Sequence, residues 1–440
     1  MRPNVSLVQP RMTGTGTEIV CIGFNTRPIA QKLAEAGYTL VVVDYFGDLD
    51  IRPHVTEGHY FLDESIEPKD PEHFKAWALA TLDRLARDRG PGRCLILPGS
   101  GFDDEPDAWK QFAGLGRVLG SSPLAVSMAR DLGVISTLFR GTACPFRVPD
   151  TRRVNIDSAT VPKAAAREVG DKLAFPVLAK RSRTAGGAGI DLVTRASALE
   201  QVFQRAKDGL RGTSGARGVA AAPVSINIQE FVGGPGAIDA SVLALNDRVV
   251  CKTMQLIGDE TVHAPKRFSY CGNSIPFDTR DARLDHAIEA LVTSLHRRFG
   301  LVGLYGFDMV LARGTANLVE INPRVPGSTE LASIAVGRNL VADHVAAFLA
   351  PEHLPSRYVA TRHAIKQILF APRDFIMPKL DELIVSGELH DITPPGTRLV
   401  AGMPILTCIH HGALDDAAAI DATARQDVKS IYAFIERDRP

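Results

Sequence analysis

Two stretches of the chain decide its fold: YGFDMVL at residues 305–311 and LVEINPRVPGS at residues 318–328. Read as adjacent β-strands, they project alternate residues from one face of a sheet, and Asp308 on the first strand can join those of the second. The polar residues of the second strand are Glu320, Asn322 and Arg324. Carboxylate and amide oxygens are ligands that Mg²⁺ accepts beside phosphate, and a guanidinium forms a fork for a phosphoryl group or a carboxylate. The pair therefore predicts a magnesium site for phosphoryl transfer.

The alternative for this pair is a surface hairpin whose charges are merely solvated. Its residues Leu318, Val319 and Ile321 are apolar, which indicates a strand that is largely buried. Carboxylates in such a strand are costly unless they are paired or bind a metal. We therefore favour the metal site over the surface hairpin.

Upstream, PVLAKRSRTAGGAGI at residues 176–190 reads as a strand that ends in Lys180 and continues into a glycine-rich hairpin loop. The glycines Gly186, Gly187 and Gly189 leave the backbone free to approach a polyphosphate and to donate N–H groups, while Lys180 adds a positive charge. The alternative is an ordinary turn. The stretch is not a Walker A loop, because no Gly-Lys-Ser/Thr follows the glycines.

The segment NIQEFVGGPG at residues 227–236 has apolar flanks and then a Gly-Pro break. Such a segment can act as a hinge between two lobes and offer backbone groups to the edge of an adenine ring. The alternative is a plain strand end. The residues that lead into the break are Gln229, Glu230, Phe231 and Val232.

Residues 18–125 alternate short apolar runs with helical periodicity, which predicts a parallel α/β sheet. Ligands bind at the carboxyl ends of the strands in such sheets. The first strand-to-helix turn reads GFNTRPIA and lacks the G-x-G-x-x-G fingerprint, so a nicotinamide cofactor is unsupported. Arg27 in this turn would suit a carboxylate or a phosphate, although a tight turn with Pro28 at the helix start is the simpler interpretation.

The order of these motifs (lysine and glycine loop, hinge, then Asp…Glu-x-Asn-x-Arg) resembles the ATP-grasp superfamily, which includes D-alanine–D-alanine ligase, glutathione synthetase and biotin carboxylase. The opening IGFNTRPIAQKLAEAGYTLVVVDYFGD, with QEFVGG, DASVLAL and EINPR, looks most like a branch of predicted ATP-dependent carboligases related to biotin carboxylase, of the methanogen and methylotroph type. The resemblance implies an α/β and α+β fold. Its expected parts are a flexible tail (1–17), a Rossmann-like pre-ATP-grasp domain (18–125), a two-lobed ATP-grasp domain (126–355, hinge near 229–236) and a small mostly-β closing domain (356–440).

The resemblance also implies roles for individual residues. Lys180 would contact the α- and β-phosphates of ATP under the glycine loop, and Arg324 would stabilise the charge that develops on the transferred phosphoryl group. Two Mg²⁺ ions would be held by Asp308, Glu320 and Asn322. Adenine would be bound by Gln229, Glu230, Val232 and the backbone of Phe231, with Asp239 as the candidate for the ribose. Relatives often carry an Asp-Lys pair early in this domain, whereas SMARDLGV offers only Arg130, which puts that phosphate contact in doubt.

The activity that the resemblance implies is an ATP-dependent carboxylate–amine ligation through an acyl phosphate, on small-molecule substrates and in a homodimer. Its implied setting is the biosynthesis of a one-carbon carrier cofactor of the tetrahydromethanopterin or methanofuran type, with an amino acid such as glutamate added. The alternatives are a biotin-carboxylase-like carboxylase, a phosphotransferase and a non-catalytic ATP-binding regulatory protein. The loop at 209–223 and the glycine loop are the candidate lids. Candidates for lining the acceptor pocket, with ordinary packing as the favoured alternative, are His263, Tyr270 and Cys271.

Composition narrows the remaining classes. Lys and Arg number 50, as do Asp and Glu, so the formal net charge is zero and nothing attracts nucleic acid or an anionic membrane over the whole surface. The apolar runs are too short to span a bilayer, and the polar N-terminus lacks the apolar region of a signal peptide. The six cysteines form no C-x-x-C pair, which argues against a zinc site or a disulfide framework and predicts a cytoplasmic protein.

Overall fold

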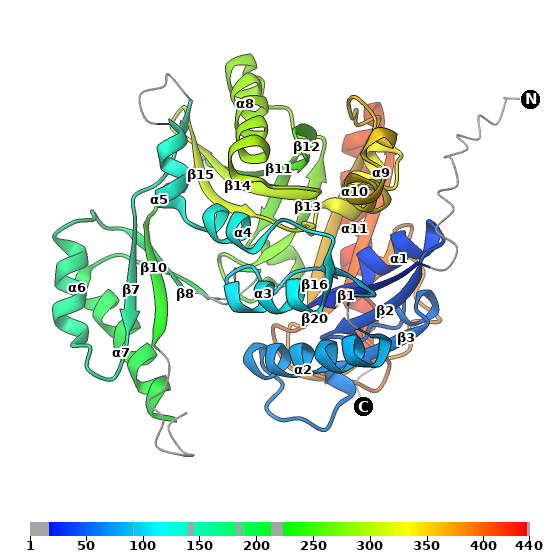
Figure 1. Cartoon of the computed structure of the whole chain (residues 1–440), viewed down its shortest axis with the longest axis horizontal. Coiled ribbons are helices and arrows are strands. Elements are labelled where there is room, and N and C mark those ends of the chain that lie inside the picture. The colour runs from blue at the N-terminus through cyan, green and yellow to red at the C-terminus, as the bar shows by residue number, and fades with distance from the viewer. Residues whose placement is uncertain are drawn as a thin grey trace, which may run out of the picture.

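The computed structural model describes residues 17–437, apart from residues 91, 140–144, 182–185, 188 and 213–222. The predicted tail, except for residue 17, and most of the predicted lid at 209–223 lie outside the described residues. Figure 1 shows a parallel sheet, two antiparallel sheet regions and helices packed against them, which confirms the mixed α/β and α+β class. None of the helices in the described ranges is long and apolar enough to cross a lipid bilayer.

The N-terminal part of the chain is a five-stranded parallel sheet in the order β3-β2-β1-β4-β5. Residues 40–43 in its interior are apolar and buried, as expected for a parallel strand covered by helices on both faces. The helices α1, α2 and α3 begin with proline in the first turn, where the missing N–H breaks no hydrogen bond. The elements are β1 (Glu18–Gly23), α1 (Arg27–Glu35), β2 (Thr39–Asp44), β3 (Glu57–Tyr60), α2 (Pro71–Arg89), β4 (Cys94–Pro98), α3 (Pro106–Leu115) and β5 (Gly116–Val118).

A four-stranded antiparallel sheet in the order β7-β10-β8-β9 forms a small lobe at the left of Figure 1. Ile226 and Ile228 lie on its apolar face, which packs against two helices. Lys180 pairs with Asn227, so both lie on the opposite face together with Gln229. The antiparallel pairing of β8 with β9 confirms the predicted hairpin. The elements are β7 (Thr151–Ile156), α6 (Pro162–Gly170), β8 (Val177–Arg181), β9 (Ile190–Val193), α7 (Ala196–Gly212) and β10 (Val224–Glu230).

The largest sheet has nine strands in the order β18-β20-β16-β13-β12-β11-β14-β15-β6. One of its faces is apolar: Val242, Phe307 and Met309 pack there with the buried side of α8. The sequence places Ala287, Leu291, Leu295 and Phe299 at helical spacing, and all four are buried on this side of the helix. The elements are β6 (Phe146–Arg147), β11 (Ile238–Leu245), β12 (Arg248–Ile257), β13 (Tyr270–Ile275), α8 (Ala282–Phe299), β14 (Leu304–Ala312), β15 (Thr315–Asn322), β16 (Arg362–Phe370), β18 (Glu388–His390) and β20 (Pro404–Ala413).

The other face of this sheet is polar, and we call it the polar face. Residues that pair directly across neighbouring strands share a face, so the register lines their side chains up in rows. The first row crosses β15, β14, β11 and β12 as Glu320, Asp308, Ser241 and Thr253. The second row crosses β12, β13 and β16 as Gln255, Asn273 and Lys366.

The C-terminal part of the chain continues the large sheet, because β16, β18 and β20 form one side of it. It also contacts the N-terminal part, where the Leu49 N–H donates to the carbonyl of Ile392 at 2.9 Å. The predicted domain boundaries stay predictions. The remaining helices and strands are α4 (Pro123–Arg130), α5 (Leu132–Ser136), α9 (Thr329–Val336), α10 (Leu340–Leu349), β17 (Phe375–Ile376), β19 (Arg398–Leu399) and α11 (Ala417–Arg437). The short 3₁₀ helices are η1 (Arg52–His54), η2 (Phe61–Asp63), η3 (Thr137–Phe139), η4 (Glu260–Val262), η5 (Pro351–His353) and η6 (Leu414–Asp416).

Candidate active site

The three predicted metal ligands come together on the polar face. Asp308 lies directly opposite Glu320, and the Nδ2 of Asn322 donates to the Oδ2 of Asp308 at 3.1 Å. The register between β14 and β15 shifts after Asp308, a β-bulge that leaves Val319 as the extra residue. Because of this bulge, Leu318 is buried in the apolar core while Glu320 stays on the polar face. Bulges of this kind commonly re-aim side chains beside active sites.

Two arginines hold these carboxylates against the end of strand β4. Arg130, the last residue of α4, donates from Nη1 to Glu320 Oε1 at 2.6 Å and from Nε to Asp104 Oδ1 at 2.8 Å. Arg324 donates from Nε to Asp103 at 3.0 Å. Asp103 and Asp104 follow the carboxyl end of β4, where open α/β sheets bind ligands. The N-terminal sheet and the polar face therefore meet at this point.

The charges in this group shift one another's ionisation. Burial raises the pKa of Asp308 to about 7, and the neighbouring charge of Glu320 acts in the same direction. Burial also opposes ionisation of Glu320, but the positive charges of Arg130 and Lys180 outweigh it and lower its pKa. Burial lowers the pKa of Lys180, against the pull of the Glu320 carboxylate. Strongly shifted groups that face one another are typical of functional sites.

Lys180 brings the small lobe to the same group. Its charge acts on Glu320 and Asp308, yet its Nζ makes no hydrogen bond or ion pair within the described part of the chain. Gln229, two residues beyond the partner of Lys180 on the same face, is 1% exposed; its Nε2 donates to Thr151 Oγ1 at 3.1 Å. Its Oε1 is buried without a hydrogen-bond partner. Free donors and acceptors on this face are available to a ligand.

The glycine loop contacts the large sheet. The Tyr270 N–H donates to the carbonyl of Gly186 at 3.1 Å. Gly187 has φ +78°, and a Cβ on it would lie 1.8 Å from the carbonyl oxygen of Phe268. Gly189 completes the turn by accepting from the Arg181 N–H at 3.0 Å. Gly187 is thus a position where only glycine fits, and the loop spans from the small lobe to the large sheet.

The residues of the predicted hinge have mainly their backbone groups to offer a ligand. The Glu230 side chain is engaged by Arg147, and the Phe231 N–H donates to the carbonyl of Pro176 at 3.3 Å. The Val232 N–H has no hydrogen-bond partner among the described residues. The Phe231 ring packs edge-on against Phe268, with ring centroids 6.3 Å apart. Arg147 therefore occupies the Glu230 side chain, and the predicted adenine contact of Glu230 stays a prediction.

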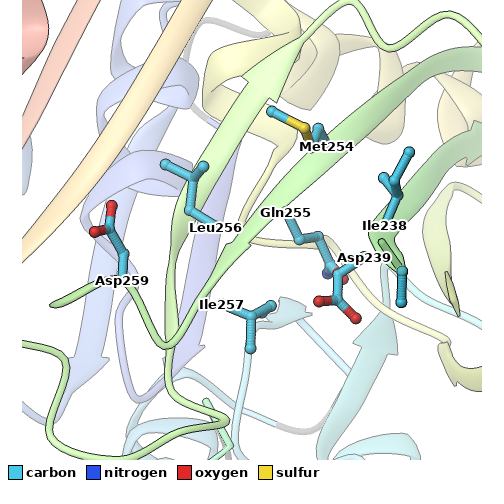
Figure 2. Close-up of a pocket in the computed structure, with 8 residues that line it drawn as sticks. Ile238, Asp239, Met254, Gln255, Leu256, Ile257 and Asp259 are labelled. Carbon is cyan, nitrogen blue, oxygen red and sulfur yellow. The ribbon is translucent and has the colours of Figure 1, made fainter. Parts of the chain in front are cut away.

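A cavity of about 350 Å³ opens where the hinge meets strands β11 and β12. Figure 2 shows the side chains of Asp239 and Gln255 pointing toward one another in it. Gln255 also reaches the metal candidates, because its Nε2 donates to Asp308 Oδ1 at 3.0 Å. Burial raises the pKa of Asp239. The predicted ribose residue thus lines a cavity whose floor extends to Asp308, and its size suits a small-molecule site.

The three residues predicted to line the acceptor pocket lie in different surroundings. The Tyr270 hydroxyl donates to Asn273 Oδ1 on the polar face. His263 is exposed and packs edge-on against Tyr432, with ring centroids 4.6 Å apart, and Cys271 is buried in the apolar core beneath α11. Ordinary packing therefore accounts for His263 and Cys271.

Sequence reasoning missed several contacts of the site. Gln255 stands in an unremarkable strand, and the partners of Asp103 and Asp104 are far away in the sequence. The only available signal for the two aspartates was their position after a predicted parallel strand.

Residues 151–328 match the family model of the ATP-grasp domain. These residues therefore form an ATP-grasp domain, which confirms the predicted resemblance to the ATP-grasp superfamily and the predicted ATP-grasp fold.

Among curated relatives, an uncharacterised protein of Methanocaldococcus jannaschii is 20% identical over 400 residues, which are 90% of this chain and 88% of that protein. The carbamoyl phosphate synthase large chain of Corynebacterium glutamicum is 25% identical over 224 residues, 51% of this chain but only 18% of that protein.

Among solved structures, L-amino acid ligase from Bacillus licheniformis has a TM-score of 0.64 at 14% identity and covers 94% of this chain and 98% of its own. A second structure is the biotin carboxylase domain dimer of Hydrogenobacter thermophilus 2-oxoglutarate carboxylase, in complex with MgADP and bicarbonate. It has a TM-score of 0.62 at 13% identity, and the match covers 89% of this chain and 85% of that chain. At these identities the likeness establishes the fold.

Proposed function

We propose that this protein is an ATP-dependent carboxylate–amine ligase that works through an acyl phosphate. The observation that carries the proposal is the convergence of Asp308, Glu320 and Asn322 with Lys180, which is unpaired among the described residues, at the junction of the two lobes of an ATP-grasp domain. The ADP- and MgADP-bound proteins of the same fold support ATP and Mg²⁺ as its cofactors. Several of these neighbours join or carboxylate small molecules, as their names say.

The residues fit magnesium and a polyphosphate. Two carboxylates and one amide oxygen are hard donors, and they leave coordination positions for the phosphate oxygens and waters that Mg²⁺ usually keeps. Within the described part of the chain, Lys180 supplies a positive charge that has no partner, and the Oε1 of Gln229 is a buried acceptor that has no donor. Bound Mg²⁺ would neutralise charge on the transferred phosphoryl group.

The protein's own part in the reaction would be positioning and electrostatic stabilisation. Arg324, fixed by Asp103, would direct its remaining guanidinium N–H groups at the phosphoryl group or at the substrate carboxylate. Arg130 would hold Glu320 until a bound nucleotide competes with Glu320 for the Arg130 guanidinium. The glycine loop, seated on Tyr270, would keep water from the acyl phosphate before the amine attacks its carbonyl carbon and displaces phosphate.

The finer parts of the proposal rest on the resemblance to the methanogen and methylotroph branch. They are the addition of an amino acid such as glutamate, a role in making a tetrahydromethanopterin- or methanofuran-type cofactor, a homodimer and a cytoplasmic location. The one alternative with an observation behind it is a carboxylase, because a bicarbonate-bound biotin carboxylase domain has the same fold.

The decisive experiment measures ADP release by the purified protein with Mg-ATP against pools of carboxylates, amines and bicarbonate. Turnover that needs both a carboxylate and an amine is the expected result. Turnover that needs bicarbonate alone would establish the carboxylase instead.

The matched variants are Asn322→Ala and Asn155→Ala, the second on an exposed part of β7. Loss of a metal ligand is expected to lower ADP release by at least about a hundredfold, while the exposed asparagine is expected to be neutral. Unchanged turnover in Asn322→Ala would refute the metal site.

A further inference from the structure

A second group of charges lies beside the metal candidates, and we call it the carboxylate cluster. It gathers at the carboxyl ends of β1 and β2, where the C-terminal segment returns to the N-terminal sheet. Its carboxylates are Asp44, Asp48, Asp50, Glu330 and Asp391, and its permanent cations are Arg27 and Lys366.

The cations of the cluster are fully engaged by its carboxylates. Arg27 is buried and donates from Nη2 to Glu330 Oε2 at 3.0 Å and from Nε to Asp391 Oδ1 at 2.9 Å. Lys366 lies 3.3 Å from Glu330 Oε2. Both cations are therefore paired with carboxylates of the cluster, which still outnumber them.

All but one of the carboxylates are satisfied inside the protein. Asp44 accepts from the N–H groups of Thr26, Phe46 and Gly47 and from the Thr26 hydroxyl. Asp50 accepts from the N–H groups of residues 391 and 392, each at 3.0 Å. His390 lies close by, with its Nδ1 3.8 Å from Asp50 Oδ2.

Asp48 is the exception. It is 5% exposed, and its carboxylate has no hydrogen bond or ion pair within the described residues. Its neighbours in sequence fix its place, because Asp44 binds the loop at 46–47 and Leu49 is bonded to Ile392. Burial raises the pKa of Asp48 well above its ordinary value, and the charges of Asp391 and other cluster carboxylates add to the effect.

An unpaired buried carboxylate among more acids than cations is unfavourable unless a cation joins it. A metal ion is disfavoured, since no group of three or more His, Cys, Asp or Glu side chains among the described residues has the geometry to hold one. An organic ammonium needs only hydrogen-bond acceptors in a loose arrangement, which the cluster provides.

The cluster is also adjacent to the metal candidates. Burial raises the pKa of the Tyr270 phenol, and the charges of Asp308 on one side and Glu330 in the cluster both add to this effect. Lys366 belongs to the second row of the polar face, two strands from Gln255, which contacts Asp308.

We propose that the carboxylate cluster binds the ammonium group of the acceptor substrate, and that Asp48 is the residue that receives it. This inference rests on the proposed ligase function, of which it names the acceptor: a primary amine that is charged when it binds. It makes bicarbonate an unsuitable occupant, since both cations of the cluster are already paired.

The first test measures binding without turnover. The thermal unfolding midpoint of the wild-type protein is recorded with n-butylammonium against n-butanol, and with glycinamide against glycolamide. Stabilisation by the ammonium ions but not by their neutral analogues, lost in Asp48→Asn, supports the proposal. Equal effects of both members of a pair, or no effect of any ammonium ion, overturn it.

The second test uses the amine found by the ADP-release screen. A lost charge-assisted contact corresponds to about a ten- to hundredfold rise in KM for the amine in Asp48→Asn, with the KM for ATP unchanged. Without ligand, this variant should unfold at the same or a higher temperature, because Asp48 has no partner to lose among the described residues and the amide is not repelled by the neighbouring carboxylates. A merely structural aspartate would give lower stability and an unchanged amine KM, which refutes the proposal.

The matched control is Asp63→Asn, an exposed carboxylate paired with Arg52 at 2.8 Å, which should alter neither KM. The two proposals fail separately. Amine-dependent ADP release that ignores Asp48→Asn would keep the ligase and reject the ammonium site. Bicarbonate-dependent release would reject the ligase, and the thermal test would still judge the cluster.

Discussion

Replacing Gly187 by alanine is expected to weaken ATP binding far more than the same change at its neighbour Gly186. Both glycines have positive φ, +62° at Gly186 and +78° at Gly187, so alanine costs about 1–2 kcal/mol at either position. They differ in their surroundings. A Cβ at Gly186 has nothing within 4 Å, whereas one at Gly187 would lie 1.8 Å from the Phe268 carbonyl oxygen and 2.6 Å from its carbon.

Because backbone atoms cannot yield to a contact of 1.8 Å, the loop with alanine at 187 has to leave its seat. It then also loses the hydrogen bond from the Tyr270 N–H to the carbonyl of Gly186, worth about 0.5–1.5 kcal/mol. The closed position becomes less favourable by about 1.5–3.5 kcal/mol, a factor of roughly 10 to 350. At Gly186 only the cost of placing alanine at positive φ applies. Its lower limit of about 1 kcal/mol corresponds to about a fivefold loss of affinity.

The assay is the dissociation constant of Mg-ATP by isothermal titration calorimetry, with the KM for ATP as a second measure once a substrate pair is known. Global stability should change little in either variant, because a loop can open without unfolding the sheets. Equal affinities of the two variants would refute the reasoning, since they would mean that the contact with Phe268 plays no part in closing the loop over the nucleotide.

Two further predictions concern protons. Below its pKa of about 7, Asp308 holds a proton that competes with magnesium. The affinity for magnesium should therefore fall by up to about tenfold for each pH unit below 7. This pH dependence should be absent from Asp308→Asn. His344 accepts from the Leu304 N–H at 2.8 Å and lies 3.0 Å from the Leu119 carbonyl, and burial lowers its pKa to about 4. As pH falls, the unfolded chain therefore takes up a proton on His344 at a higher pH than the folded protein does. The protein should lose about 3 kcal/mol of stability as pH falls from about 6.5 to 4. Urea unfolding curves should show this loss in the wild-type protein and not in His344→Asn.

The features that sequence could predict are those set by neighbouring residues. The helix at 282–299 follows from apolar spacing over a single element, and the strand pair around Asp308 and Glu320 follows from alternation over two. The hairpin after Lys180 is equally local, because Gly186 and Gly187 readily adopt the positive φ that the turn requires. In each case the physical cause lies within about thirty residues, which is the range that periodicity can reach.

The features that it could not predict depend on contacts between distant segments. Arg130 pairs with Glu320 across 190 residues, and Arg27 with Asp391 across 364. Nothing local marks Asp48 as unpaired or Leu318 as displaced by a bulge. Arg27 was expected to be simply part of a tight turn, and its position in the carboxylate cluster emerges only when the C-terminal segment folds back onto the N-terminal sheet.

The charges of the two neighbouring groups explain why both substrates of a ligation could be ordered on one sheet. Around Asp308, the carboxylates are faced by three cations, Arg130, Lys180 and Arg324, so the group is close to neutral, and a nucleotide with two magnesium ions would add almost no net charge. The carboxylate cluster has five acids and two permanent cations. A carboxylate substrate is therefore repelled from the cluster and drawn toward Arg324, while an ammonium is drawn the other way. Burial raises the pKa of the Tyr270 phenol, and the charges of Asp308 in the first group and Glu330 in the second both add to this effect.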